Sequence, residues 1–153
     1  MLCGARTALA CGVVGGYPIA DAIVTLLDGS HHPLDSNEMA FQIATAQAIA
    51  DALAQAGSVV LEPVMSLDVV VPDQFIGGVV GNLSARRARI IGVEPRGGAQ
   101  AISAEVPLAN MFGYSTDVRS LTQGRATFTM QFLRFSPVPN HVVDGIANRV
   151  RSS

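Results

Sequence analysis

The chain has 153 residues, enough to bury one sizeable core or two small ones. Its composition, 49% hydrophobic and 14% charged, is that of a globular protein and argues against a disordered chain. The net charge is −2, so no bulk positive field indicates a nucleic-acid-binding protein. Residues 1–61 hold one arginine against five acids and residues 62–153 hold nine against seven, which predicts two units with different surroundings.

Cys3 and Cys11 are too few for a disulfide framework or a zinc site, and they indicate reduced thiols in the cytoplasm. No stretch reaches the roughly 20 apolar residues that a membrane span needs. The glycine-broken opening lacks a clean signal-peptide cleavage site. We therefore expect a soluble cytoplasmic protein with no membrane partner.

The first sixty residues predict a helix over residues 4–14, a strand over Ile19–Leu27 and a long amphipathic helix. Asp35 is the expected N-cap of that last helix, and Gly57 its expected end. So few elements cannot complete a core. We therefore expect an exposed apolar face here, through which the chain can form a homodimer.

Residues 61–136 contain four segments with the alternation or the turn signals of half-buried strands. These segments are 65–71, 89–94, 99–106 and 126–135. A helix opening at Pro72-Asp73 separates the first two, and a helix opening at Pro107 separates the last two. The order β-α-β-β-α-β predicts a ferredoxin-like domain of the α+β class.

Glycines and apolar residues define the two helices of this segment. In the first helix we expect a buried stripe, with glycines that let the helix lie close on the sheet: Phe75, Ile76, Val79, Val80 and Leu83, with Gly77, Gly78 and Gly81. In the second we expect Leu108, Phe112 and Leu121 to face the core, Gly113 to lie inside the helix and Gly124 to end it. In the last strand, Phe128, Met130 and Phe132 share the predicted inner face.

Residues 107–130 read PLANMFGYSTDVRSLTQGRATFTM and resemble a signature near the C-terminus of bacterial translation elongation factor G, PLAEMFGYxTDLRSxTQGRGxxTM. Residues 17–44, YPIADAIVTLLDGSHHPLDSNEMAFQIA, resemble its fourth domain, and residues 61–100 resemble the start of its fifth. The resemblance covers the chain from about residue 12.

The resemblance implies a C-terminal fragment with three parts. Residues 1–60 would be part of domain IV, ribosomal-protein-S5-like, with a tip loop at 28–35. Residues 61–136 would be the ferredoxin-like domain V, and residues 137–153 (helix from about 140 to 151) a C-terminal helix returning to domain IV. No phosphate-binding loop occurs and no lysine is present for a guanine-reading motif. GTP and magnesium are therefore expected only in the full-length protein, and this fragment is expected to be non-catalytic, without cofactor or metal.

The family's tip enters the decoding region of the small ribosomal subunit and contacts the tRNA–mRNA duplex in the A site. The resemblance therefore implies that the tip is formed by Asp28, Gly29, Ser30, His31 and His32, with His32 at the position of the family's tip histidine. An exposed imidazole can donate a hydrogen bond to a phosphate or a 2′-hydroxyl, or stack on a base.

The family's fifth domain contacts large-subunit rRNA. Arg86 and Arg87 match its paired arginines, and with Arg89 they are the candidate rRNA contacts, because guanidinium binds phosphate in a bidentate manner. Arg119 and Arg125 are expected to be structural, pairing with Asp117 or with backbone carbonyls.

The function that this implies is ribosome contact during tRNA–mRNA translocation, together with the remaining domains of the factor. The alternatives are a ribosomal-protection or recycling paralogue and a stand-alone RNA-binding module; the DGSxH tip favours translocation over protection. An enzyme using His31, His32, Asp35 and Ser36 is a further alternative, although residues so close in sequence rarely converge as a triad.

Overall fold

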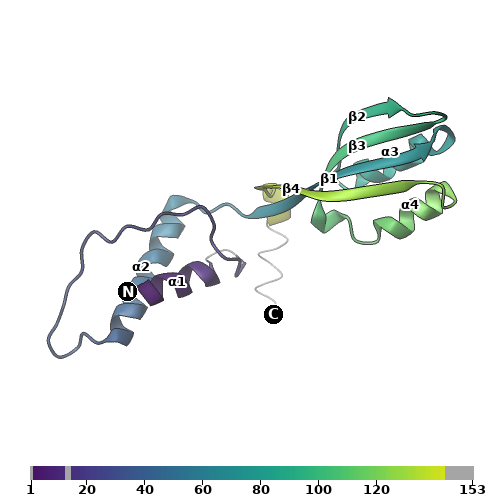
Figure 1. The fold of residues 1–153 in the computed structure, drawn as a ribbon. Coiled ribbons are helices and arrows are strands. Elements are labelled where there is room, and N and C mark those ends of the chain that lie inside the picture. The colour runs from purple at the N-terminus through teal and green to yellow at the C-terminus, as the bar shows by residue number, and fades with distance from the viewer. Residues whose placement is uncertain (1, 13–14, 144–153) are drawn as a thin grey trace. The chain divides into compact units, whose positions relative to one another are not determined.

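The structure, a computed structural model, describes residues 2–12 and 15–143, and its backbone divides into two units (Figure 1). Unit 1 comprises Met1–Val60 and Val138–Ser153, and unit 2 comprises Leu61–Pro137. The regular elements of the described chain are helices and one antiparallel sheet, which confirms the α+β class. Of the C-terminal helix predicted for residues 140–151, residues 140–143 are helical and the remainder lies outside the described residues.

Unit 1 is built on two helices, α1 (Leu2–Cys11) and α2 (Glu38–Ala56). They approach at Gly4, where an added Cβ would lie 2.6 Å from the backbone oxygen of Gln42. A side chain there would separate the two backbones, so glycine permits the approach. Further along, the two helices line an apolar groove of about 270 Å³.

The segment before α2 corrects one prediction, because Ile19–Leu27 forms no strand. It runs as an unpaired trace in Figure 1, and the side chains of Ile23 and Leu27 are 96% and 92% exposed. A strand needs a neighbour to satisfy its backbone groups, and no described segment of unit 1 supplies a ladder. Ile19–Leu27 therefore has the apolar sequence of a strand but no pairing partner among the described residues.

Helix α2 begins two residues later than predicted. Asn37, not Asp35, is the N-cap: its Oδ1 accepts a hydrogen bond from the Ala40 amide at 2.8 Å. Either residue type can cap a helix, so the sequence did not distinguish them. The predicted end is confirmed, since Gly57 follows the helix with a left-handed φ of 76°.

Unit 2 is a four-stranded antiparallel sheet in the order β2-β3-β1-β4. Its strands are β1 (Leu61–Pro72), β2 (Arg89–Pro95), β3 (Ala99–Pro107) and β4 (Thr127–Pro137). β1 pairs with both β3 and β4, and β2 pairs with β3. With one helix between β1 and β2 and another between β3 and β4, this confirms the ferredoxin-like arrangement.

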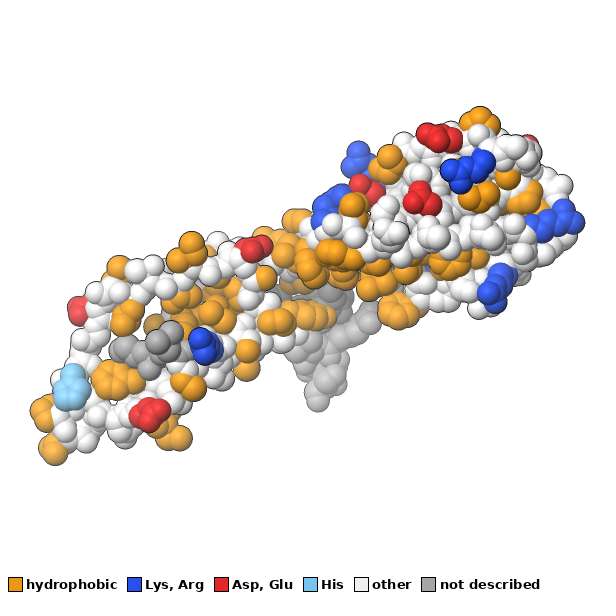
Figure 2. All heavy atoms as spheres, viewed as in Figure 1, with side chains coloured by type: hydrophobic (Ala, Val, Ile, Leu, Met, Phe, Trp, Pro, Cys, Tyr) orange, Lys and Arg blue, Asp and Glu red, His pale blue; other side chains and the backbone are white. Residues whose placement is uncertain are grey.

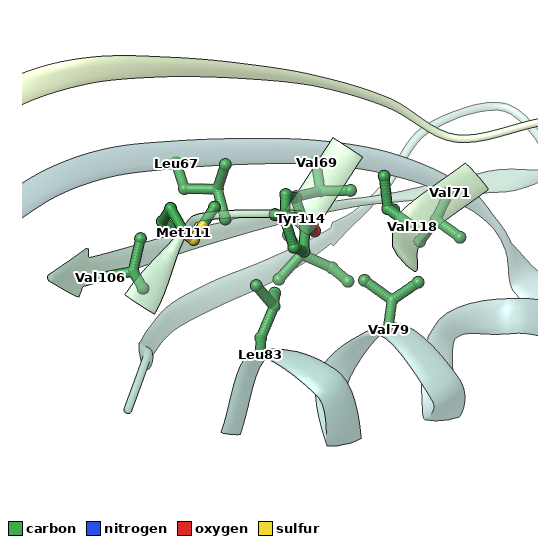
Figure 3. Packing of buried hydrophobic residues seen from close by; sticks show 10 residues of the cluster. Leu67, Val69, Val71, Val79, Leu83, Val106, Met111, Tyr114 and Val118 are labelled. Atoms are coloured by element: carbon green, nitrogen blue, oxygen red, sulfur yellow. The ribbon is translucent and has the colours of Figure 1, made fainter. Parts of the chain in front are cut away.

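Helices α3 (Ile76–Ala85) and α4 (Tyr114–Thr122) pack on one face of this sheet, each after a short 3-10 turn, η1 (Asp73–Phe75) and η2 (Leu108–Asn110). Figure 3 shows the core between helices and strands. It consists of Leu67, Val69, Val71, Val79, Leu83, Ile102, Val106, Met111, Tyr114 and Val118. The alternation of β1 thus points its apolar residues at the helices, as predicted. No helix in the described ranges is long and apolar enough to cross a membrane.

A register shift limits the predicted inner face of β4. Met65 pairs with Phe132 whereas the preceding Val64 pairs with Arg134, so Leu133 is an extra residue on β4. Such a bulge interrupts the two-residue period. Phe128 and Met130 pack against the core as predicted, but Phe132 is 57% exposed and stacks at a tilt on Phe135.

The helix glycines also differ from prediction. Gly113 precedes α4 with a left-handed φ of 76°, so it is the N-cap and not an interior residue. The buried face of α4 is therefore Tyr114, Val118 and Thr122, while Phe112 and Leu121 are exposed. In α3, a Cβ added at Gly77 or Gly81 would meet nothing within 4 Å, so close packing does not explain these two glycines.

Candidate functional site

The predicted tip loop, residues 28–35, lies between the unpaired segment and α2, and its residues are exposed. The Gly29 amide donates to Asp28 Oδ1 at 2.7 Å. The His32 and Ser36 backbones close a turn, because the His32 amide donates to Ser36 Oγ at 2.6 Å and the Ser36 amide donates to the His32 carbonyl at 3.0 Å. These local bonds shape the loop without burying it.

His32 makes its contacts at one ring nitrogen. Its Nδ1 lies 3.3 Å from Asp35 Oδ2 and 3.4 Å from the Leu34 amide nitrogen. The first contact needs a proton on Nδ1 and the second needs a lone pair, so the two contacts alternate with the tautomer. Both leave Nε2 available, and the side chain is 63% exposed. When Nδ1 accepts from the Leu34 amide, Nε2 carries the proton and can donate to an external oxygen; in either tautomer the ring can stack on a base.

His31 lies beside α2, with its ring centroid 6.4 Å from that of Phe41 and the two planes 16° apart. Figure 2 shows exposed histidine among hydrophobic side chains on this unit. The structure thus brings both predicted histidines to one exposed loop beside the start of α2.

The enzymatic alternative receives no support from this loop. The Ser36 hydroxyl accepts from the His32 backbone, and no contact among the described residues joins that hydroxyl to an imidazole. A nucleophile needs its base within hydrogen-bond reach. Nor does any group of three His, Cys, Asp or Glu side chains suited to a metal ion occur in the described ranges.

Arg86, predicted as an rRNA contact, is turned inward in unit 2. Its guanidinium pairs with Asp117 Oδ2 at 2.5 Å and donates to the carbonyls of Asn110 at 2.5 Å and Phe112 at 3.1 Å. Nε donates to Asn82 Oδ1 at 3.0 Å, and the group lies 5.4 Å from the ring centre of Tyr114. The side chain is 15% exposed. Its donors are largely used within the fold.

Arg87 is also paired internally. It contacts Glu62 through both carboxylate oxygens, at 2.7 and 3.3 Å, and Asn110 Oδ1 at 3.4 Å. It occupies a left-handed φ of 61° just after α3, where the Ala88 amide bonds the Leu83 carbonyl. This is a Schellman-type end with arginine where glycine is usual, so the backbone is strained at this residue.

Arg89 is exposed at the start of β2, opposite Glu105 on β3. The pKa of Glu105 is lowered, chiefly by its hydrogen bond to Arg134 and further by the charge of Arg89. Arg119 and Arg125 are exposed too. Asp117, expected to pair with one of them, pairs with Arg86 instead. Contact of any of these arginines with RNA stays a prediction.

Reading the sequence missed Glu62 and Asn110 as partners of the arginines, and it assigned Asp117 to the wrong arginine. They lie 23 to 31 residues from the arginines they bind. The arginines follow α3, whereas Glu62 lies on β1, Asn110 in η2 and Asp117 on α4. The tertiary fold brings these residues together, and no local sequence spacing indicates that they are close. Asn110 and Asp117 lie inside the segment whose motif resembled a known family, but no role had been assigned to Asn110.

Each of the two units matches a model of a known protein family. The family model described as "Elongation factor G, domain IV" matches residues 2–57, and that described as "Elongation factor G C-terminus" matches residues 59–146. A crystal structure of a protein from Thermus thermophilus is similar, with a TM-score of 0.82 and 35% sequence identity. The similarity covers 98% of this chain and 23% of that chain, so the chain spans less than a quarter of that relative's length.

Proposed function

Because the chain belongs to the elongation factor G family, we propose that it is the ribosome-contacting C-terminal portion of a translocation GTPase. The observation that carries this proposal is the match of both units, in order, to the family's domain IV and C-terminus. The exposed tip loop with two histidines is compatible with contact to an RNA duplex.

In the proposed mechanism this chain acts through position and charge. Its tip loop would occupy the decoding region of the small subunit while unit 2 rests on the large subunit, and the tRNA–mRNA duplex would be kept from returning. GTP and magnesium would be bound by domains outside this chain, and the site of action would be the cytoplasm. Because RNA contact involves phosphates, ribosome binding should weaken as salt rises.

The test is a substitution in the tip loop of the full-length factor. His32→Ala should slow single-round translocation while leaving ribosome-stimulated GTP turnover nearly unchanged, because the loop is remote from nucleotide chemistry. His141→Ala removes another exposed histidine outside the loop and serves as the matched control. Translocation at the normal rate in His32→Ala would contradict the proposed role of the tip.

We further propose that the exposed apolar side chains of unit 1 support self-association of the isolated chain. They include Ile23, Leu27 and Leu34, each at least 90% exposed. Sedimentation velocity over a range of concentrations should show dimers. A monomer at the highest concentration would contradict this.

A further inference from the structure

The segment from the last residue of η2 to the N-cap of α4, residues 110–113, is held by the two arginines that follow α3. Arg86 donates to the carbonyls of Asn110 and Phe112, and Arg87 reaches the side chain of Asn110. Gly113 then turns the chain in a left-handed conformation into α4. The guanidinium of Arg86 thus binds the carbonyls on either side of Met111, and that of Arg87 binds only the side chain of Asn110.

The charges that hold this connection are already neutralised. Arg86 pairs with Asp117 and Arg87 with Glu62, and the two arginine side chains are only 15% and 29% exposed. Removing either carboxylate would leave a partly buried cation without its partner, which is costly. We call the contacts of Arg86 and Arg87 with residues 110–113 the brace. Because both arginines are paired with carboxylates inside the fold, they attract an external phosphate only weakly.

Phe112 is presented outward by this brace. Its side chain is 81% exposed, whereas its neighbours Met111 and Tyr114 are 7% and 2% exposed and belong to the core. A large aromatic side chain whose backbone is fixed in advance loses little entropy on binding. Aromatic side chains of this kind are common anchors in protein interfaces.

We propose that Phe112 is a contact residue that enters an apolar pocket of a protein component of the ribosome, and that Arg86 is the residue that positions it. This rests on the proposed function, from which the ribosome is taken as the partner. A protein pocket is favoured over RNA because RNA affinity depends on unneutralised cations near the contact, and both arginines behind Phe112 are paired.

The test uses the absence of tryptophan from the chain. Phe112→Trp, an exposed aromatic exchange, places a single fluorophore at the proposed contact. On titration with bacterial 70S ribosomes, the emission should shift to the blue and become protected from iodide quenching. Phe132→Trp, at another exposed phenylalanine of unit 2, is the matched control and should change less. Co-sedimentation measures binding independently.

Arg86→Lys in the Phe112→Trp background tests positioning. Lysine keeps the charge but loses the planar fork, so about three- to tenfold more ribosome should be needed for the same shift. The slope of log affinity against log salt should not change, whereas loss of a phosphate contact would reduce it by about one. If Arg86→Lys unfolds the chain, Phe112→Ala, at an exposed position, should lower the affinity measured by co-sedimentation by a similar factor.

Each outcome decides between these possibilities. Binding with unchanged emission at residue 112 would overturn the inference while leaving the proposed function in place. Quenching without a blue shift would indicate stacking on a base and overturn the choice of a protein partner. A smaller slope of log affinity against log salt in Arg86→Lys would show that Arg86 contacts phosphate and would overturn its role as a positioning residue. Absence of co-sedimentation at low salt would remove the proposed function, and this inference with it.

Discussion

Tyr114 is a buried core residue of unit 2 that lies next to Arg86. Its ring is 2% exposed and packs edge-on against Phe128, with centroids 5.1 Å apart. Its hydroxyl has no hydrogen-bond partner among the described residues. Burial raises the pKa of Tyr114 to about 12, although the charge of Arg86 acts in the opposite direction. The ring contributes to packing while its hydroxyl is left unsatisfied.

We therefore predict that Tyr114→Phe is neutral or stabilises the chain by up to about 1 kcal/mol, because it removes an unsatisfied buried group. The pKa is higher in the folded state, so the wild type should lose stability as pH rises from about 10 to about 12, where only the unfolded chain ionises. Tyr114→Phe should lack this contribution. Urea unfolding at pH 8 and pH 11 measures both effects; a large destabilisation at pH 8 would show that the hydroxyl has a partner.

At the residue scale the sequence could identify candidates but not their partners. The histidines of the tip loop were recognisable from the DGSxH motif, and they do lie exposed on one loop. Arg86 and Arg87 were recognisable as a cationic pair. Their inward orientation depends on Glu62, Asn110 and Asp117, which only the tertiary fold brings near.

Predicted strands formed where the sequence alternates and a neighbouring strand is present to pair with. β1 and β3 alternate and are paired on both sides, so pattern and structure agree. Ile19–Leu27 has strand-like residues but no described strand to pair with, so the pattern failed. The α4 prediction failed for another reason: a glycine in a helix-like run can be an N-cap when its φ is positive, and composition does not reveal φ.

Two glycines give a matched test of this element-scale reading. Gly81 lies within α3, facing open space with an ordinary φ, so Gly81→Ala should stabilise the chain by about 0.5–1 kcal/mol. Gly113 also faces open space, but its φ is 76°, so Gly113→Ala should destabilise by about 1 kcal/mol. Thermal or urea unfolding of both variants gives the comparison. Equal effects at the two positions would contradict the N-cap assignment.

The whole molecule combines two units of unequal core size. The buried hydrophobic side chains of unit 1 are Ile49 and Val138 within the described ranges, whereas the remaining ones belong to unit 2. Burial of apolar surface is the main source of stability, so the units should differ in stability. The family relationship was recognisable from sequence because its motifs span both units, and the incomplete core of unit 1 was expected from its few elements. Which side chains of unit 1 are buried became evident only in the structure.

Native-state hydrogen exchange should therefore divide along the same boundary. We predict that amides of α1 and α2 exchange through openings of lower free energy than amides of β1 and β3, since fewer buried contacts must be broken. Leu67 and Val69, both fully buried in β1, are suitable reporters for unit 2, and Ile49 for unit 1. The same opening free energy in both sets would mean that the chain unfolds as one cooperative unit.

The most direct test of the central claim is hydroxyl-radical probing from the tip loop of the full-length factor on the ribosome. Ser30→Cys, in a background with Cys3 and Cys11 replaced by alanine, carries the tethered iron chelate. The proposed function predicts cleavage of small-subunit rRNA in the decoding region. Cleavage confined to large-subunit rRNA, or none from a ribosome-bound factor, would contradict it.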